Sequence, residues 1–411
     1  MTAPDRGEDD GAGPAPPHRP PTRAWAVRRV AEVLAAGALE RVRGVPAAGP
    51  ADVPRSPAEV TPQWLTAVLC RGTPGARVRA VTPVGASSGT TTRRALALTY
   101  DDADSANRLP THIFVKCTAA LGQRLMLGLG GLIHGEPGFY TQVRPRLEIE
   151  APIGYFGAVD ARSWRSVVVM EDVGRTRGAR FWQPATRITR RQIEDLLSNM
   201  ARWHGALWDS PRLGGWRWLK TPADQMRLID ALIGLANRLP AGAERARAVI
   251  PVGLRHRQAD IYAGLRRSMQ IASEGPRTYL HGDLHIANTY LTRESAMGIA
   301  DWQVGLQGSW AFDYAYLMTT ALEVDERRAW ERDLLGFYLQ RLAAAGGAAL
   351  RPERAWLAYR QATFYPYFAW TYTLGRSRLQ PRFQPDEVSL TMIRRIAAAI
   401  DDLGSLDAVG R

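Results

Sequence analysis

Asp283, Asn288 and Asp301 are the residues whose types and spacing point most directly to chemistry. They lie in His281-Gly-Asp-Leu-His-Ile-Ala-Asn288 and, after a short apolar strand and a turn, in Gly298-Ile-Ala-Asp301. Asn288 follows Asp283 by five residues, and Asp301 follows Asn288 by thirteen. This layout is typical of a hairpin for phosphoryl transfer. One carboxylate accepts the proton of a hydroxyl nucleophile, while the amide and the second carboxylate hold Mg²⁺ on nucleotide phosphates.

The same segment has an alternative interpretation as a metal-hydrolase cluster. His281, Asp283 and His285 are residue types that bind Zn²⁺ or Mn²⁺. A hydrolase site would need further His ligands downstream, and the sequence has none after His285 and only seven in all. The spacing of the two carboxylates and the amide therefore favours phosphoryl transfer.

This segment resembles the aminoglycoside phosphotransferase and choline kinase superfamily, which shares the protein-kinase fold but has His-Gly-Asp where protein kinases have His-Arg-Asp. The continuation is similar to the ecdysteroid-kinase-like branch: Asp301-Trp-Gln, then Gly308-Ser-Trp-Ala-Phe-Asp313-Tyr-Ala-Tyr-Leu, then residues 327–346. The resemblance covers about residues 56–400. It implies an α+β, two-lobed protein-kinase-like fold, with a five-stranded antiparallel sheet in the N-lobe and a mostly helical C-lobe. It also implies ATP and Mg²⁺ as cofactors.

The hairpin residues then divide into chemical and structural roles. Asp283 is the candidate base that orients the acceptor hydroxyl. Asn288 and Asp301 are hard oxygen donors and the candidate Mg²⁺ ligands. By resemblance, His281 steadies the catalytic loop and Asp313 braces it from the following helix.

Lys116 ends the strand pattern Ile113-Phe-Val-Lys116 and is the candidate to bind the α- and β-phosphates of ATP. The chain has 51 Arg and only two Lys, and a narrow phosphate site can demand the more compact cation. An ordinary solvated Lys is the alternative. Glu136 follows twenty residues later, and the resemblance implies that its carboxylate pairs with Lys116. A carboxylate favoured by the dipole of a helix N-terminus is the alternative for Glu136.

The turn at residues 85–92 lies where a phosphate-covering loop belongs. It is small and polar, so its backbone N–H groups and hydroxyls suit phosphate oxygens. It lacks the Gly-x-Gly-x-x-Gly pattern, and an ordinary hairpin turn is the alternative. The candidate nucleotide-binding residues in this turn are Ser87, Ser88, Gly89 and Thr90.

The expected contacts with adenine rest on the resemblance alone. It implies that the Glu171 carbonyl and the Val173 N–H meet the adenine edge and that Met170 lies behind the base. Residues 171–174 also interrupt the strand pattern, as a hinge between two lobes would.

The acceptor is predicted to be a small molecule. Only about ten residues separate Asp301-Trp-Gln from the next helix, which leaves no peptide-docking segment. Residues 209–276 and the C-terminal helices are the predicted acceptor region. The segment 364–372 is aromatic and has no acidic residue, so it favours a large, partly apolar alcohol over a polycation. Tyr367, Trp370 and His285 are the candidate acceptor contacts, with Pro366 expected to break the helix and tilt rings toward a cleft; core packing is the alternative.

The composition and charge restrict the other classes of function open to this protein. The net charge is +13, but the basic residues are spread along the chain without an aromatic-interleaved patch, which argues against nucleic acid as the main partner. Two cysteines make no disulfide framework, no apolar run approaches the roughly 20 residues that span a bilayer, and the first residues are not a secretory signal. A cytoplasmic enzyme is expected, with its oligomeric state open.

The predicted function is ATP- and Mg²⁺-dependent transfer of the γ-phosphate to a hydroxyl of a lipophilic metabolite. Two alternatives are an antibiotic-resistance kinase of the aminoglycoside or macrolide type and a non-catalytic, kinase-like nucleotide-binding module. Every expected catalytic position is occupied, which disfavours the second alternative.

The predicted elements follow this plan. Residues 1–50 are expected to form a disordered tail and an amphipathic helix at 25–43, with the N-lobe at 51–172 and the C-lobe at 173–411. Ser56-Pro-Ala-Glu59 reads as a capping box that starts a helix running to residue 69. Strands are predicted at 78–84, 94–100, 112–118, 153–158 and 166–170, and later helices at 121–132, 137–147, 189–208, 253–272, 311–323, 325–345, 352–374 and 385–403.

Overall fold

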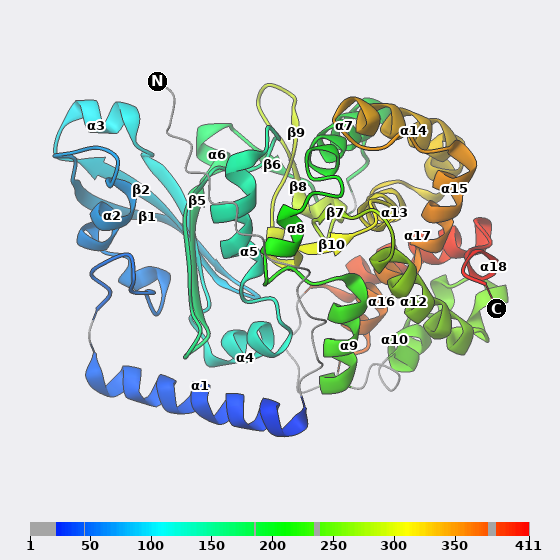
Figure 1. Cartoon of the computed structure of the whole chain (residues 1–411), viewed down its shortest axis with the longest axis horizontal. Helices are drawn as coiled ribbons and strands as arrows, with labels where there is room; N and C mark the ends of the chain where they lie inside the picture. The colour runs from blue at the N-terminus through cyan, green and yellow to red at the C-terminus, as the bar shows by residue number, and fades with distance from the viewer. Residues whose placement is uncertain (1–21, 45, 185, 234–238, 377–383, 411) are drawn as a thin grey trace.

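The chain is divided into a sheet-containing part and a helical part, which lie side by side (Figure 1). The computed structural model describes residues 22–44, 46–184, 186–233, 239–376 and 384–410. The predicted disordered tail therefore lies outside the described residues, apart from residue 22. Among the described helices, none combines the length and apolar character needed to cross a membrane.

The N-lobe contains the five-stranded antiparallel sheet that the sequence predicted. Its strand order is β1-β2-β3-β5-β4, which places β3 at the centre. The β1–β2 turn is shorter than predicted, because Ser88 pairs with Thr92 and only residues 89–91 remain between the strands. The strands are β1 (Val78–Ser88), β2 (Thr92–Tyr100), β3 (His112–Cys117), β4 (Gly154–Asp160) and β5 (Arg165–Glu171).

The predicted capping box at residue 56 is wrong. Ser56 makes no side-chain cap, and a short 3₁₀ turn (Pro57–Glu59) ends before a separate helix, α2 (Pro62–Leu69). Thr61 caps α2 instead, since its hydroxyl oxygen accepts the Trp64 backbone N–H at 3.1 Å. Proline cannot continue a preceding helical turn but suits the first helical position, so Pro62 forces this restart.

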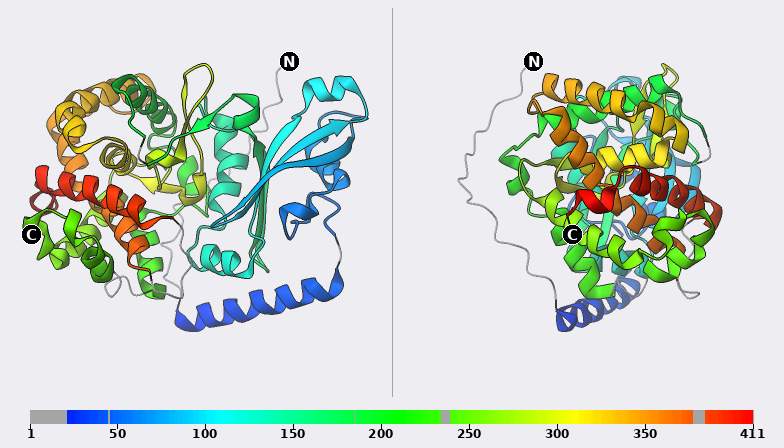
Figure 2. Two further views of the ribbon diagram at one scale, coloured as in Figure 1. Left: turned by 180° about the vertical axis from the view of Figure 1, so that it is seen from behind. Right: turned by 90° about the vertical axis from the view of Figure 1, so that its right-hand side faces the viewer.

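The predicted N-terminal helix is present as α1 (Arg23–Arg43). It lies along one edge of the molecule, beneath α4 (Leu121–Leu129), and its first turns reach α9 of the C-lobe (Figure 2). Val33 is fully buried and clusters with Leu127 and Trp164. The helix is therefore docked on the folded body.

The C-lobe is built from helices around one large apolar core. The predicted long helix at 352–374 is two helices, because the chain turns at Ala362 and Thr363. The C-lobe helices are α7 (Arg190–Ala206), α8 (Arg212–Gly215), α9 (Pro222–Ile233), α10 (Leu239–Arg245), α11 (Val252–Arg255), α12 (Gln258–Ser273), α13 (Ala311–Ala321), α14 (Val324–Ala344), α15 (Pro352–Gln361), α16 (Phe364–Leu374), α17 (Asp386–Asp402) and α18 (Ser405–Ala408).

Short strands at the boundary between the lobes carry the predicted catalytic hairpin. β8 (Thr289–Leu291) pairs with β9 (Met297–Ile299), and β8 also pairs with β6 (Arg180–Phe181). β7 (Thr278–Leu280) pairs with β10 (Leu306–Gly308). The loop between β7 and β8 holds Asp283 and Asn288, and Asp301 follows β9, so these strands fix all three residues.

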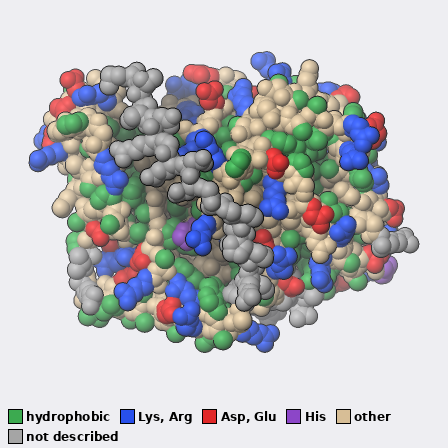
Figure 3. Space-filling view, in the orientation of Figure 1, with side chains coloured by type: hydrophobic (Ala, Val, Ile, Leu, Met, Phe, Trp, Pro, Cys, Tyr) green, Lys and Arg blue, Asp and Glu red, His purple; other side chains and the backbone are tan. Residues whose placement is uncertain are grey.

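On the face seen in Figure 3, basic and acidic side chains are interspersed rather than gathered by sign. The positive charge is thus dispersed over that face.

Candidate active site

The central strand of the N-lobe places one ammonium between two carboxylates. Lys116 near the end of β3 lies 2.6 Å from Glu136 Oε1 and 3.2 Å from Asp301 Oδ1, measured from Nζ. The ion pair between Lys116 and Glu136 that the resemblance implied is therefore present. It joins the sheet to α5 (Gly135–Gly138), and the second contact joins both to the C-lobe.

Close packing holds α5 against the turn that follows β9. A Cβ atom on Gly135 would lie 2.0 Å from the Gln303 carbonyl oxygen, so only glycine fits here. Glu136 therefore sits on a segment in direct backbone contact with the Asp301-Trp-Gln turn. The predicted single helix at 137–147 is instead α5 followed by a π-helical turn (Phe139–Val143), a local distortion that often marks functional sites.

The two carboxylates around Lys116 have opposite pKa shifts. Burial raises the pKa of Glu136 even though Lys116 opposes the shift. Burial also acts to raise the pKa of Asp301, but the Lys116 ammonium and then the Arg93 guanidinium outweigh it, and the net pKa is well below its usual range. Asp301 is thus ionised at neutral pH and suited to bind a cation.

Arg93 is a site residue that the sequence reading missed. It pairs with Lys116 across β2 and β3, and its Nη2 lies 3.6 Å from Asp301 Oδ2. Asp301 itself has a left-handed backbone, with φ 65°. The alternating pattern of the strand predicts that Arg93 lies on the sheet. It does not predict the contact with Asp301, which is more than two hundred residues away in the sequence.

The catalytic loop is held through its backbone by Asp313. The Asp313 carboxylate accepts the His281 N–H at 2.6 Å and the Gly282 N–H at 2.9 Å. Gly282 has φ +80°, and a Cβ there would lie 2.3 Å from the Val304 carbonyl oxygen. His204, fully buried on α7, lies 3.4 Å from the same carboxylate. These contacts agree with a bracing role for Asp313, and His204 lies in the core.

Both ring nitrogens of His281 are engaged. Its Nδ1 accepts the Asp283 backbone N–H at 3.2 Å, so Nε2 carries the proton and donates to the Ala300 carbonyl oxygen at 3.0 Å. Neither nitrogen is free to bind a metal ion. Within the described ranges, no group of three or more His, Cys, Asp and Glu residues is arranged to hold a metal. The metal-hydrolase alternative therefore has no ligand set in this part of the chain.

Asp283 lies at the surface of the catalytic loop, with 37% of its side chain exposed. The Tyr316 hydroxyl donates to Asp283 Oδ1 at 2.7 Å. His285 Nε2 lies 3.7 Å from Asp283 Oδ2, and burial lowers the pKa of His285, so its ring is neutral at neutral pH. Tyr316 was not singled out from the sequence, because it lies 33 positions after Asp283 and this separation gives no local signal of the contact.

Asn288 is oriented by the same loop. Its Nδ2 donates to the Asp283 carbonyl oxygen at 2.9 Å. The Ala300 N–H donates to the Asn288 carbonyl oxygen at 2.9 Å, which ties Asn288 to the residue before Asp301. Because the amide nitrogen is used inside the loop, Oδ1 of Asn288 is the atom left for a ligand.

The predicted phosphate loop is tied to α4. Gln123 Nε2 donates to the Gly89 carbonyl oxygen at 2.9 Å, and the Thr92 hydroxyl lies 3.2 Å from Gln123 Oε1. The tip is closed by the Gly89 N–H, which donates to the Thr91 carbonyl oxygen at 2.9 Å. Thr90 is half-buried. The side chains of Ser87 and Ser88 lie outside the described residues, so the phosphate role of this loop stays a prediction.

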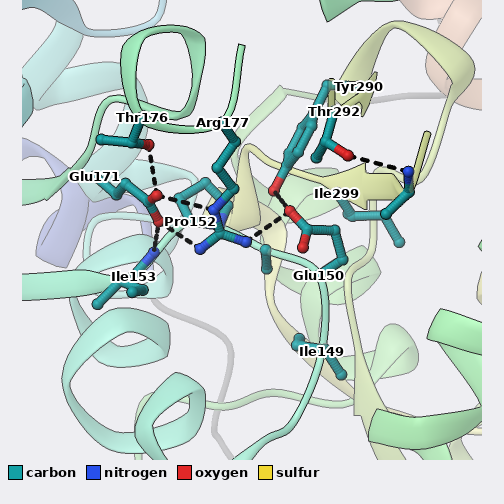
Figure 4. Close-up of polar contacts among 12 residues, drawn as sticks. Ile149, Glu150, Pro152, Ile153, Glu171, Thr176, Arg177, Tyr290, Thr292 and Ile299 are labelled. Carbon is teal, nitrogen blue, oxygen red and sulfur yellow. Dashed lines mark hydrogen bonds and ion pairs between the residues drawn. The ribbon is translucent and has the colours of Figure 1, made fainter. Parts of the chain in front are cut away.

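At the hinge, the Glu171 carboxylate is used within the protein (Figure 4). It accepts from the Ile153 N–H at 3.1 Å, the Thr176 hydroxyl at 2.6 Å and Arg177 Nε at 2.8 Å. Burial would raise the pKa of Glu171, but these donors lower it overall. Arg177 also contacts Glu150 Oε1 at 2.7 Å. The adenine roles of Glu171, Val173 and Met170 concern backbone groups and packing, and they stay predictions; Met170 and Val173 are buried.

The hinge network continues into the catalytic hairpin. The Tyr290 hydroxyl on β8 donates to Glu150 Oε1 at 2.9 Å (Figure 4). The Glu150 backbone is held by Asn199 on α7 through its Oδ1 and Nδ2, each at 3.0 Å. Hinge, hairpin and α7 are thereby joined by one polar network.

The three candidate acceptor residues differ in position. The Trp370 ring meets the His285 ring edge-on at 5.3 Å, next to Asp283. Tyr367 is almost completely buried, and its hydroxyl donates to Gln258 Oε1 at 3.0 Å. Pro366 does not break the helix as predicted, because it lies in the first turn of α16, where a missing N–H costs no hydrogen bond. The structure thus brings His285 and Trp370 to the site and places Tyr367 in the core.

Two cavities lie away from Asp283. One, of about 390 Å³, is lined by residues of the hinge side, among them Arg144, Glu150 and Asn199. The other, of about 710 Å³, lies between α1 and the β4–β5 turn, with Glu40 and Arg165 in its lining. Neither lining includes a candidate catalytic residue, so neither cavity is taken as the acceptor site.

The fold and this site define a two-lobed, kinase-like protein, in which a strand Lys paired with a helix Glu also contacts the Asp that follows the β8–β9 hairpin. Residues 234–347 match the ecdysteroid kinase-like family, which confirms the resemblance in the segment with the hairpin. No curated protein shows significant sequence similarity to the chain.

Solved structures of small-molecule kinases and phosphotransferases show distant similarity to the chain. The choline kinase LicA from Streptococcus pneumoniae is 10% identical, with 79% of this chain and 94% of that chain covered and a TM-score of 0.43. The macrolide 2'-phosphotransferase MphH from Brachybacterium faecium is 14% identical, with 73% and 88% covered and a TM-score of 0.43. The aminoglycoside phosphotransferase APH(3'')-Id from Streptomyces rimosus, in complex with ADP and streptomycin, is 17% identical, with 73% and 96% covered and a TM-score of 0.38. Similarity this low carries no conclusion about acceptor or cofactor.

Proposed function

We propose that the protein is an ATP-dependent O-phosphotransferase for a small molecule with a hydroxyl group. Asp283 accepts the proton of the acceptor hydroxyl, Lys116 binds phosphate oxygens, and Glu136 holds Lys116 in place. The acceptor oxygen forms a bond to the γ-phosphorus while the bond from that phosphorus to the β,γ-bridging oxygen breaks and ADP leaves.

The observation that carries this proposal is the convergence of Lys116, Glu136 and Asp301. The three residues come from β3, α5 and the turn after β9, and Lys116 contacts both carboxylates within 3.2 Å. Taking an ammonium and two carboxylates out of water has a desolvation cost, so such a cluster is weak evidence for a stabilising role alone. Phosphoryl transfer uses such a cation to neutralise charge on the transferring group.

Asn288 and Asp301 are suited to hold Mg²⁺. Both offer hard oxygen atoms, Asp301 is ionised at neutral pH, and the Asn288 amide nitrogen is already used within the loop. Mg²⁺ binds to one or two protein oxygens and completes its shell with phosphates and waters. The ion would supply charge neutralisation on the phosphates.

For the acceptor, we favour a lipophilic metabolite over a polycation. The aromatic side chains beside Asp283 are buried: Trp370 and Tyr316 pack on the ring of His285, which is neutral. This neutral, aromatic packing around the base gives a polycation little electrostatic attraction, whereas an apolar alcohol does not depend on such attraction. Within the described residues, Asp283 is the only acidic side chain in this group of contacts.

The proposal is tested by measuring ADP release from ATP with the purified chain and a panel of acceptors. The panel contains hydroxylated steroids and polyketides, choline, and aminoglycosides, each with and without Mg²⁺. We expect metal-dependent turnover with a lipophilic alcohol and its loss in Asp283→Asn. Efficient turnover of aminoglycosides alone would favour the resistance-kinase alternative, and nucleotide binding without turnover of any acceptor would favour the binding module.

A further inference from the structure

Tyr316 contacts the side chain of the proposed base from a buried position on α13. It is 1% exposed, and its hydroxyl donates to Asp283 Oδ1 at 2.7 Å. Asp313 lies one turn earlier on the same helix and holds the backbone N–H groups of His281 and Gly282. Residues three apart lie on the same face of a helix. One face of α13 therefore fixes both the backbone of the catalytic loop and the side chain of Asp283.

The hydroxyl of Tyr316 remains protonated throughout the physiological range. Burial, and then the adjacent Asp283 carboxylate, raise the pKa of Tyr316 well above its usual range. A carboxylate has no proton to give, so the direction of this hydrogen bond is fixed: Tyr316 donates and Asp283 accepts. Tyr365 packs against the Tyr316 ring at 5.9 Å and holds it in place.

The two oxygens of Asp283 therefore have different environments. Oδ1 is occupied by the Tyr316 hydroxyl at 2.7 Å, whereas the nearest ring nitrogen to Oδ2 is His285 Nε2 at 3.7 Å, beyond hydrogen-bond distance. A half-turn of the carboxylate exchanges two equivalent oxygens and restores the same hydrogen bond, so one oxygen is held by Tyr316 in either case and the other is left. A hydrogen bond to a charged group is stronger than one between neutral groups, so this orientation of the carboxylate plane is favoured.

We propose that Tyr316 is a positioning residue for phosphoryl transfer: it holds Oδ1 of Asp283 so that Oδ2 faces the acceptor hydroxyl. This inference rests on the proposed function. In the transfer step, the acceptor proton passes to Oδ2 as the acceptor oxygen bonds to the γ-phosphorus of ATP and ADP leaves. Tyr316 exchanges no proton; it fixes the direction from which the hydroxyl is held, and misplacement of the base slows the step.

A matched control is available elsewhere in the C-lobe. Tyr359 is also fully buried, and its hydroxyl donates to the Glu331 carboxylate at 3.0 Å. Glu331 pairs with Arg327, away from the catalytic hairpin. Tyr359→Phe therefore removes the same chemical group from the same kind of contact without touching Asp283. Tyr316→Phe and Tyr359→Phe should lower the melting temperature to a similar extent.

The test compares kcat, acceptor KM and ATP affinity for the two variants, with Asp283→Asn and the double variant Asp283→Asn, Tyr316→Phe. We expect Tyr316→Phe to lower kcat about tenfold to a hundredfold with ATP affinity unchanged, and Tyr359→Phe to keep kcat within about twofold. In the Asp283→Asn background, Tyr316→Phe should add little further loss, because both changes act on one element of the mechanism.

The outcomes separate this inference from the proposed function. If Asp283→Asn is inactive but Tyr316→Phe has wild-type kcat, Tyr316 is a structural residue only and the inference is wrong, while the proposed function stands. If the wild-type chain releases no ADP with any acceptor, the proposed function fails; if Asp283→Asn retains full turnover, Asp283 is not the base and the inference about Tyr316 fails with that assignment. Equal kcat losses in Tyr316→Phe and Tyr359→Phe would assign both to stability. ATP affinity, measured at a temperature below the melting transition, shows that each variant is folded.

Discussion

Replacement of Lys116 by methionine should destabilise the folded chain in a pH-dependent way. The change keeps the length of the side chain and removes the ammonium that lies 2.6 Å from Glu136. Removing one partner of a buried ion pair costs about 3–5 kcal/mol when the other stays charged. Glu136 is buried, with its side chain 3% exposed, whereas Asp301 keeps Arg93 as a partner, so the cost falls mainly on Glu136.

Protonation of Glu136 limits that cost. The free energy needed to protonate a carboxyl group rises by about 1.36 kcal/mol for each pH unit above its pKa. For an unfolded pKa of 4.5, pH 7 is 2.5 units higher, so protonation costs about 3.4 kcal/mol. At pH 5 the same limit is about 0.7 kcal/mol. Because burial raises the folded pKa of Glu136, the protonated form stabilises the fold below pH 4.5, and this stability is lost as the pH rises toward the folded pKa. Lys116→Met should therefore be nearly as stable as wild type at pH 5 and clearly less stable at pH 7.

The assay is urea denaturation at both pH values for wild type, Lys116→Met and the double variant Lys116→Met, Glu136→Gln. The double variant removes both charges and should recover most of the stability at pH 7, since neutral replacements for a buried pair are often tolerated. The assigned role of Glu136 would be refuted if Lys116→Met lost the same free energy of unfolding at pH 5 and pH 7. It would also be refuted if the double variant recovered no stability, because the cost would then not come from a buried, unpaired Glu136.

Three further outcomes follow from the site. Lys116→Arg should retain folding but lose most phosphoryl transfer, because the bulkier guanidinium displaces the phosphates; ADP release measures this, and wild-type turnover would contradict it. Asp301→Asn should abolish the Mg²⁺ dependence of ATP affinity in titrations with and without the metal; an unchanged dependence would exclude Asp301 as a ligand. Gly282→Ala should destabilise by about 1–3 kcal/mol and impair turnover, since Gly282 has φ +80° and its Cβ would meet the Val304 carbonyl oxygen. Gly214→Ala is the control for thermal melting, because its Cβ would meet nothing within 4 Å.

Several elements were predictable because their signals are local. Alternating or continuous apolar runs bounded by turn residues marked the five strands of the N-lobe sheet, and the periodic pattern marked α1, α7 and α17. The hairpin was recognised from residue types at fixed spacing between Asp283 and Asp301. These patterns lie within single elements or one hairpin, where the order of residues already restricts the geometry.

Other elements were mispredicted where two local rules compete. Ser56-Pro-Ala-Glu59 fits a capping box, yet Pro62 cannot continue that turn, so the helix begins after Thr61. In the segment 352–374, Pro366 was taken as the break, but a proline in the first turn of a helix breaks nothing. The break at Ala362 and Thr363 depends on how α15 and α16 pack on different neighbours.

Such patterns could not predict which residues the site residues contact. Arg93 meets Asp301, Tyr316 meets Asp283, and Gly135 meets the Gln303 backbone, and each pair joins separate elements. Their sequence separations leave no periodic or spacing signal, because the contacts arise only when separate elements pack together in the folded chain. The primary structure therefore supplied the candidate reacting groups. The packing of α5, α13 and β2 against the hairpin set their distances and ionisation, because burial and nearby charge exist only in the folded chain.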